Sequence, residues 1–235
     1  MEKISCLISL IRRSCPLTKP SDQIPDRLRV HLFRHGHLEN SEKSLINGST
    51  DIRLSEKGRR QMAFWGSHLN GMSASFFVSS TLARTKESLS LVKLDREGET
   101  LALESLSERR FGSWEGLTRE EISARDPEGY KRWLEVDPSF APEGGESLFG
   151  FSKRVLSGWD EVLRKSGFGK EIMMVCHSGT NRILILHALG LSIQSYFRFS
   201  QEHAAHNIID FYRDHPPCLM TLNQTPESIL GSGNV

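Results

Sequence analysis

Two short apolar runs, each followed at once by a turn that contains histidine and glycine, constrain the fold of this chain most strongly. They are Leu28 to Phe33 before Arg34-His35-Gly36, and Ile172 to Cys176 before His177-Ser178-Gly179. Such continuous apolar runs are typical of strands that are buried on both faces of a parallel sheet. Because open α/β sheets bind ligands at the carboxyl ends of their strands, we expect both histidines and Arg34 at one edge, where they can bind an anion.

The rest of the chain alternates between strand and helix patterns, which predicts an α/β fold. The expected strands cover 28–33, 75–79, 100–103, 171–176 and 207–212, and the last of them is expected at the edge of the sheet. The expected helices cover 55–69, 146–166 and the segments that follow residues 81 and 179. The helix over 146–166 is the best defined, because Phe151, Val155 and Trp159 recur at helical spacing. We therefore expect a mostly parallel central sheet with helices on both faces.

The segment 109–150 is expected to form a small helical cap beside the anion site. Within it, Thr118 and Glu121 have the spacing of a capping box, and Pro127 divides the helical pattern that follows. Residues 130–133 either contact the group attached to the anion or belong to a solvated amphipathic helix. The sequence leaves both alternatives open.

Length and composition indicate one domain over 27–235. The 235 residues are 37% hydrophobic and 25% charged, which is ordinary for a soluble globular protein. Residues 1–26 contain three prolines, and we expect them to form a loosely ordered extension.

The charge balance and the cysteines exclude several classes of partner and site. The 30 lysines and arginines nearly cancel the 29 aspartates and glutamates, so no overall field favours nucleic acid or an anionic membrane. No apolar run is long enough to span a bilayer. The four cysteines form no CxxC pair and no zinc-ligand spacing. We therefore expect reduced thiols in the cytoplasm, and neither a metal ion nor a cofactor.

The residues near the two turns suit phosphoryl transfer, which needs donors around the phosphoryl oxygens and an in-line nucleophile. Arg34 and Arg84 can bind a phosphoryl group, because a guanidinium is always charged and can donate two parallel hydrogen bonds. A neutral imidazole at His35 can attack phosphorus without a separate base. A protonated His177 would stabilise the charge that develops on the oxygens.

Further residues are expected to complete this site. Glu108 is the candidate general acid and is preferred over Glu115, because Glu108 ends the predicted approach to the pocket whereas Glu115 follows a turn. Gly36 and Gly179 would let the backbone approach the ligand closely. Ser178 offers a hydroxyl or backbone donor at a helix N-terminus.

Six short motifs stand in order along 28–212. They are Leu32 to Asn40, Arg84 after Ser79-Ser80, Leu106 to Glu108, Gly112 to Gly116, Gly144 to Ser147, and Val175 to Gly179. Together they resemble the histidine phosphatase superfamily, in the branch of the phosphoglycerate mutases and α-ribazole phosphatases, and so imply a phosphoglycerate mutase-like fold. The roles that the resemblance implies are phosphorylated nucleophile for His35, proton donor and acceptor for Glu108, and ligands of the phosphoryl group for Arg34, Arg84 and His177.

Two positions near the first turn depart from the family's usual pattern. The resemblance implies that Asn40 supplements the phosphate pocket, although it lies one residue closer to His35 than in many members. His37 stands where glutamate is usual, and this difference bears on the pH response or on substrate fit.

The leading hypothesis is a metal-independent phosphomonoesterase that hydrolyses a small phosphorylated metabolite through a phosphohistidine at His35. An alternative is a 2,3-bisphosphoglycerate-dependent phosphoglycerate mutase, because Glu108 to Gly112 resembles the mutase version of this motif. A further alternative is a catalytically weak module that binds phosphoproteins. The sequence leaves open which metabolite is bound and whether the chain is a monomer or a homodimer.

Overall fold

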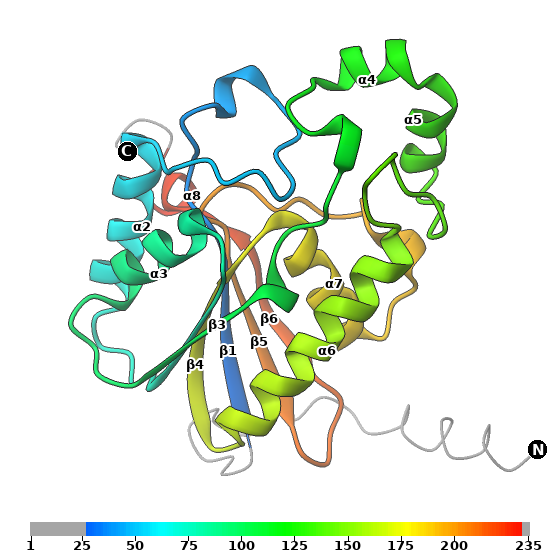
Figure 1. The fold of residues 1–235 in the computed structure, drawn as a ribbon. Helices are drawn as coiled ribbons and strands as arrows, with labels where there is room; N and C mark the ends of the chain where they lie inside the picture. The colour runs from blue at the N-terminus through cyan, green and yellow to red at the C-terminus, as the bar shows by residue number, and fades with distance from the viewer. Residues whose placement is uncertain (1–26, 232–235) are drawn as a thin grey trace, which may run out of the picture.

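The central element of the computed structural model, which describes residues 27–231, is a six-stranded sheet in the order β3-β2-β4-β1-β5-β6 (Figure 1). The strands are β1 (Arg27–Arg34), β2 (Phe76–Ser80), β3 (Glu99–Leu103), β4 (Lys170–Cys176), β5 (His206–Tyr212) and β6 (Cys218–Gln224). The first four strands of the sequence run parallel to one another. β5 is antiparallel to β1, and β6 is antiparallel to β5. The expected mostly parallel sheet is confirmed.

Helices cover both faces of this sheet, as Figure 1 shows. One face packs against α6 (Leu148–Ser166) and α7 (Ser178–Leu189), and the other against α2 (Glu56–His68) and α3 (Ala83–Lys93). Side chains of β4 alternate between the two cores, because successive residues of a strand point to opposite faces. The strand therefore reads as an unbroken apolar run.

The end of the chain differs from what the sequence predicted. The strand over 207–212 was expected at the edge of the sheet, and that prediction was wrong, because β5 lies between β1 and β6. No strand was predicted over the residues of β6. The apolar residues of β6 do not form a buried face, because the side chains of Met220 and Leu222 are 41% and 42% exposed. A five-residue helix, α8 (Pro226–Leu230), follows and contacts α2.

The cap consists of α4 (Arg119–Arg125) and α5 (Pro127–Leu134), which lie beyond the end of the sheet (Figure 1). The predicted capping box is present, since the Thr118 hydroxyl accepts from the Glu121 N–H and the Glu121 carboxylate accepts from the Thr118 N–H. Pro127 starts α5, as expected. The cap has its own small apolar cluster, formed by Trp114, Ile122, Trp133 and Phe140. Three of these four side chains are aromatic.

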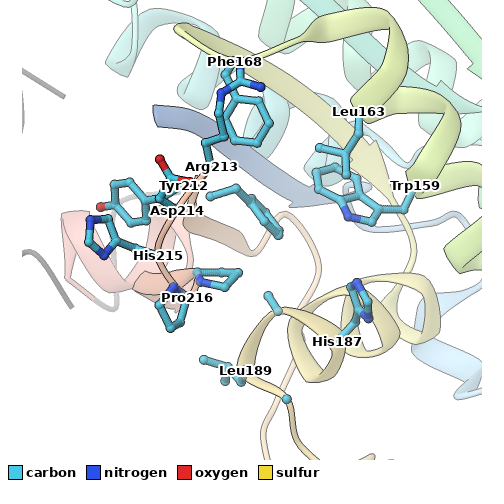
Figure 2. Close-up of a pocket in the computed structure, with 14 residues that line it drawn as sticks. Trp159, Leu163, Phe168, His187, Leu189, Tyr212, Arg213, Asp214, His215 and Pro216 are labelled. Carbon is cyan, nitrogen blue, oxygen red and sulfur yellow. The ribbon is translucent and has the colours of Figure 1, made fainter. Parts of the chain in front are cut away.

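Figure 2 shows a cavity of about 880 Å³. It lies at the opposite end of the sheet from the two histidine turns, because its lining residue Tyr212 pairs with Arg27 at the start of β1. It is lined by side chains from the end of α6, the end of α7 and the β5–β6 connection, among them Trp159, Phe168, His187, Tyr212 and Pro216. None of the predicted site residues lines it. Size alone therefore does not identify the functional cleft.

Two expectations lie partly outside the described residues. The extension over 1–26 falls outside them entirely, as do Cys6 and Cys15. Cys176 is a buried free thiol. Between residues 27 and 231, no helix combines the length and the apolarity needed to traverse a membrane.

We predict that Gly36→Ala lowers the free energy of unfolding by about 1–3 kcal/mol, because overpacking a tight backbone contact is costly. A Cβ at Gly36 would lie 2.5 Å from the carbonyl oxygen of Gly58 in α2. Gly71→Ala is the matched control, since nothing lies within 4 Å of a Cβ there. Urea unfolding of both variants measures the difference, and equal losses would contradict the packing described here.

Candidate active site

The register of β1 and β4 brings His35 and His177 together. Arg34 pairs with Cys176 across the two parallel strands, so the residues that follow each strand are neighbours. The His35 N–H donates to the Cys176 carbonyl at 3.0 Å, and the centroids of the two imidazole rings are 5.3 Å apart. Both imidazoles are buried. The structure thus places the two histidines at one edge of the sheet.

The His35 imidazole is held as one tautomer. Its Nδ1 lies 2.9 Å from the carbonyl oxygen of Gly36. Because a carbonyl only accepts, Nδ1 carries the proton and Nε2 keeps its lone pair. Burial, then the charges of Arg84 and Arg34, lower the pKa of His35 well below its usual value. His35 is therefore neutral near pH 7, which is the form that a nitrogen nucleophile needs.

His177 is also oriented, through both ring nitrogens. Nδ1 accepts from Arg84 Nε at 3.3 Å, so Nε2 carries the proton and donates to the Ser80 hydroxyl at 2.8 Å. Burial, followed by the charges of Arg84 and Arg34, lowers the pKa of His177 well below its usual value. Its protein surroundings therefore favour the neutral ring, and the expected protonation of His177 beside a bound phosphate stays a prediction. Only a bound dianion would oppose that shift.

Arg34 is fixed by groups that follow α7. Its Nη1 donates to the Gln201 carbonyl at 2.6 Å, and its Nη2 lies 2.9 Å from Nε2 of His203. Its Nε is buried and has no hydrogen-bond partner among residues 27–231. Burial is the main cause that lowers the pKa of Arg34, to about 10, so the side chain is charged near pH 7. The Nε–H is a donor without a partner beside His35, as an anion site requires.

Arg84, in the first turn of α3, is 1% exposed. Its two Nη atoms donate to the carbonyls of Gly48 and Thr50, each at 2.7 Å. Each Nη atom carries a second hydrogen, so the guanidinium can still donate to a ligand. The loop over 48–50 thus fixes Arg84 without using all of its donors.

Glu108 is held at the start of α7. One carboxylate oxygen accepts from the Arg109 N–H and the other from the Gly179 N–H, both at 3.0 Å. A Cβ at Gly179 would lie 2.3 Å from the Glu108 carboxylate. Gly179 therefore lets the carboxylate approach the helix.

An ion pair between Arg154 of α6 and Glu146 holds the backbone before Glu108 in place. Arg154 makes two 2.8 Å contacts with the carboxylate of Glu146. The same guanidinium donates to the carbonyls of Ser107 and Glu108, at 3.0 and 3.2 Å. This arrangement positions Glu108 from the side remote from the cleft.

The predicted residues surround one cleft of about 430 Å³. His35, Arg34, Arg84, Glu108, Ser178 and Gly179 line it, together with Ile46, Asn47, Phe111, Arg119, Trp133, Arg182, Tyr196, Phe197, Gln201 and Glu202. His177 lies behind Arg84 and is not one of the lining residues. Between residues 27 and 231, no group of three or more histidine, cysteine, aspartate or glutamate side chains is suited to hold a metal ion.

Comparison with known families agrees with this geometry. Residues 30–224 match the family model described as the histidine phosphatase superfamily, branch 1. The chain belongs to this superfamily.

Several relatives cover most of this superfamily domain. A bifunctional protein of Mycobacterium tuberculosis is 33% identical over 201 residues, which are 84% of this chain and 54% of that protein. Phosphoserine phosphatase 1 of Hydrogenobacter thermophilus is 26% identical over 182 residues, or 77% of this chain and 86% of that protein. The crystal structure of the α-ribazole phosphatase from Shigella flexneri superimposes with a TM-score of 0.76 at 26% identity, covering 83% of this chain and 96% of that one. The chain spans about half the length of the first of these relatives.

Within the superfamily site, Glu115 is a structural residue. Its carboxylate accepts from the backbone N–H groups of Ser49 and Thr50, each at 2.9 Å, and from that of Phe111. The hydroxyls of Thr50 and Ser49 also donate to it. Burial opposes its ionisation, but the hydrogen bonds, led by that of the Thr50 hydroxyl, outweigh burial and lower the pKa of Glu115. Glu115 does not line the cleft; it stabilises the loop whose carbonyls hold Arg84. This position favours Glu108 as the proton donor.

Two predicted binding residues lie beside the cleft instead of lining it. The Asn40 amide exchanges hydrogen bonds with that of Asn47 at 2.7 and 3.3 Å, and Asn47 is the one that lines the cleft. Gly36 packs against Gly58. Its lack of a side chain therefore serves the packing of α2 against the turn.

Sequence reasoning missed the arginines Arg119 and Arg182 as lining residues. Arg182 donates to the Ser178 hydroxyl and to the Phe199 carbonyl. Its position four residues after Ser178 on α7 could have indicated this contact, because residues at that spacing share a helix face. No local signal distinguished Arg119 from other cap arginines.

Three further histidines lie close to the site: the half-buried His203 and the buried His31 and His206. His203 is 5.7 Å from the His35 ring, measured between centroids. Behind it, His31 and His206 lie 3.0 Å apart, Nδ1 to Nε2. Burial is the largest cause that lowers the pKa of each, to about 3 for His31 and to about 2 for His203. All three imidazoles are therefore neutral near pH 7.

We predict that the free energy of unfolding falls as the pH is lowered from about 6.5 toward 3. Between these pH values the histidines of the unfolded chain bind protons. The same histidines in the folded chain stay neutral, because their pKa values are lowered. Acid therefore favours the unfolded state. His31→Asn should lessen the slope by up to about 1.4 kcal/mol per pH unit. Urea unfolding at several pH values measures the slope. His187→Asn, at an exposed position, is the control and should leave it unchanged; a slope equal to wild type in His31→Asn would contradict the account.

Proposed function

We propose that this chain is a metal-independent phosphomonoesterase, which transfers phosphate from a small metabolite to His35 and then to water. The observation that carries the proposal is the His35 imidazole, whose Nδ1 is bonded to the Gly36 carbonyl while the ring lines a cleft with Arg34 and Arg84. A neutral nitrogen nucleophile beside two guanidinium groups suits attack on a phosphate ester.

In the first step, Nε2 of His35 attacks phosphorus and the bond from phosphorus to the ester oxygen breaks. Glu108 gives its proton to that oxygen, so the alcohol leaves in neutral form. In the second step, the Glu108 carboxylate takes a proton from water, whose oxygen attacks the phosphohistidine. Inorganic phosphate leaves and His35 returns to its neutral form.

The cationic groups are proposed to stabilise the charge on the phosphoryl oxygens during both steps. Arg34 would offer its Nε–H, which has no partner among the described residues, and Arg84 its second Nη hydrogens. His177 can take part only if its Nε2–H exchanges the Ser80 hydroxyl for a phosphoryl oxygen. A phosphate dianion would also favour protonation of this ring.

The substrate is proposed to be a small phosphorylated metabolite. Relatives named for phosphoserine and α-ribazole support a phosphate ester as substrate. The wider part of the cleft offers the aromatic side chains Phe111, Trp133, Tyr196 and Phe197 to a leaving group. The free thiol of the buried Cys176 supports the cytoplasm as the proposed site of action.

The proposal predicts a phosphoenzyme that depends on His35. Incubation with a labelled phosphate ester, followed by a rapid quench, should give acid-labile and base-stable label on the wild-type chain. His35→Ala should carry no label and lose at least about 1,000-fold in kcat, because the nucleophile is absent. Label incorporation and phosphate release are measured on the same samples, with and without chelator.

Three outcomes separate the alternatives. Full activity of His35→Ala would overturn the proposal, and loss of activity with chelator would contradict the metal-independent reaction. Turnover that needs 2,3-bisphosphoglycerate and releases no phosphate would favour a phosphoglycerate mutase. Tight binding of a phosphopeptide without turnover would favour a binding module.

A further inference from the structure

The hydroxyl of Tyr196 is a polar group in the cleft that the two proposed steps do not use. The side chain lines the cleft and is only 6% exposed, and its hydroxyl makes no hydrogen bond within residues 27–231. The other two hydroxyls of the lining differ from it, since that of Ser178 accepts from Arg182 and Ser200 is exposed. A buried polar group without a protein partner is costly, and a ligand or a water molecule commonly satisfies it.

This hydroxyl lies beside the carboxylate of the proposed acid and base. A Cβ placed on Gly179 would be 2.3 Å from Oε1 of Glu108 and 2.6 Å from the Tyr196 hydroxyl oxygen, so the two oxygens flank one point at the start of α7. The next neighbour of that point is a ring carbon of Phe151, at 3.1 Å. The two oxygens make no hydrogen bond to each other. One water molecule, with hydrogen bonds of about 2.8 Å to both oxygens, spans such a separation.

The Tyr196 ring is held in place by the short helix η5 (Ile193–Ser195) and by two side chains. The Tyr196 N–H donates to the Ile193 carbonyl at 3.0 Å. The ring packs edge-to-face against Phe197 at 5.0 Å between centroids, and the guanidinium carbon of Arg182 lies 5.7 Å from its centroid. Burial, then the charge of Glu108, raises the pKa of Tyr196. The phenol therefore keeps its hydrogen near pH 7, and its oxygen can still accept a hydrogen bond.

The two steps of the proposed reaction place different atoms next to Tyr196. In both steps, the oxygen that leaves or attacks phosphorus exchanges one proton with Glu108. In the first step, the other substituent of that oxygen is the carbon of the leaving group. In the second step, it is the second hydrogen of water. Only the water therefore has a hydrogen to donate to the Tyr196 oxygen.

We propose that Tyr196 positions the water that attacks the phosphohistidine, and so favours hydrolysis over transfer to an alcohol. This inference rests on the proposed phosphatase activity. One hydrogen of the water is donated to Glu108 and becomes the proton that the carboxylate takes up. The other is donated to the Tyr196 oxygen and stays on the phosphate. The bond from the water oxygen to phosphorus forms as the bond from phosphorus to Nε2 of His35 breaks. Because both hydrogens are held, a lone pair of the water is directed at phosphorus.

The variant Tyr196→Phe tests this inference, because it removes only the hydroxyl. In rapid-quench experiments with labelled p-nitrophenyl phosphate, formation of label at His35 reports the first step. Loss of that label, after a chase with unlabelled ester, reports the second step. We expect the rate constant for loss to fall about 10- to 100-fold, the effect of one hydrogen bond in the transition state, and that for formation to change less than about threefold. Equal slowing of both steps, or loss at the wild-type rate, would overturn the proposal.

Added glycerol gives a second readout, because an alcohol that attacks the phosphohistidine has no second hydrogen to donate to Tyr196. Transfer to glycerol should therefore keep its wild-type rate in Tyr196→Phe while hydrolysis slows. We expect the ratio of glycerol phosphate to inorganic phosphate to rise by the same factor by which the loss of label slows. An unchanged ratio would contradict a contact between Tyr196 and the attacking water.

Tyr130→Phe is the matched control, because Tyr130 lies in α5 of the cap and does not line the cleft. It should retain the wild-type rate constants and the wild-type product ratio. If the wild-type chain carries no label and hydrolyses no ester, the proposed function fails. If the wild-type chain is labelled at His35 and turns over, and Tyr196→Phe behaves in the same way, only the role of Tyr196 is overturned.

Discussion

The parallel pairing of β1 with β4 is the constraint on which the rest of the site depends. Its register places Arg34 opposite Cys176, so that the next residue of each strand is a histidine at the same edge. β2 ends at Ser80 on the other side of β4, and the Ser80 hydroxyl lies 2.8 Å from His177. A shift of one residue in this register would turn every side chain of the strand to the other face. Catalytic geometry and core packing are therefore set by the same pairing.

Segments that are distant in sequence then hold the charged groups in place. Glu115 stabilises the loop over 48–50, whose carbonyls fix Arg84. Arg154 and Glu146 clamp the backbone that carries Glu108. Most of these contacts use backbone groups, which cannot rotate away as side chains can. The phosphate pocket is consequently ordered by the protein itself, and such preorganisation is what electrostatic catalysis requires.

Local sequence patterns were sufficient for the elements that have a clear apolar spacing or clear capping residues. β1, β4, α6 and the divided cap helix were predicted to within two residues, because their apolar spacing or capping residues are unambiguous. β6 was missed because its exposed apolar residues do not follow the alternation of a half-buried strand. Its partner β5 was accordingly placed at the wrong position in the sheet.

Some of the site residues could likewise be predicted from the sequence, and others could not. His35, Arg34, Arg84 and Glu108 were expected to lie together, and the structure brings them to one cleft. The protonation of His177 could not be predicted, since it depends on how deeply the ring is buried beside Arg84. Asn47 lies in a loop and Arg119 begins α4 of the cap. Tertiary contacts set the positions of both, so no spacing along the chain indicated them. Their roles follow from three-dimensional neighbours alone.

The most direct test of this account is the position of the phosphorus on the His35 ring. The hydrogen bond from Nδ1 to the Gly36 carbonyl leaves only Nε2 free to react. Heteronuclear NMR of histidine-labelled protein, phosphorylated by substrate and then unfolded in alkali, distinguishes the two nitrogens. We expect phosphorus on Nε2 of His35 and on no other histidine; phosphorus on Nδ1, or on a different histidine, would contradict the account.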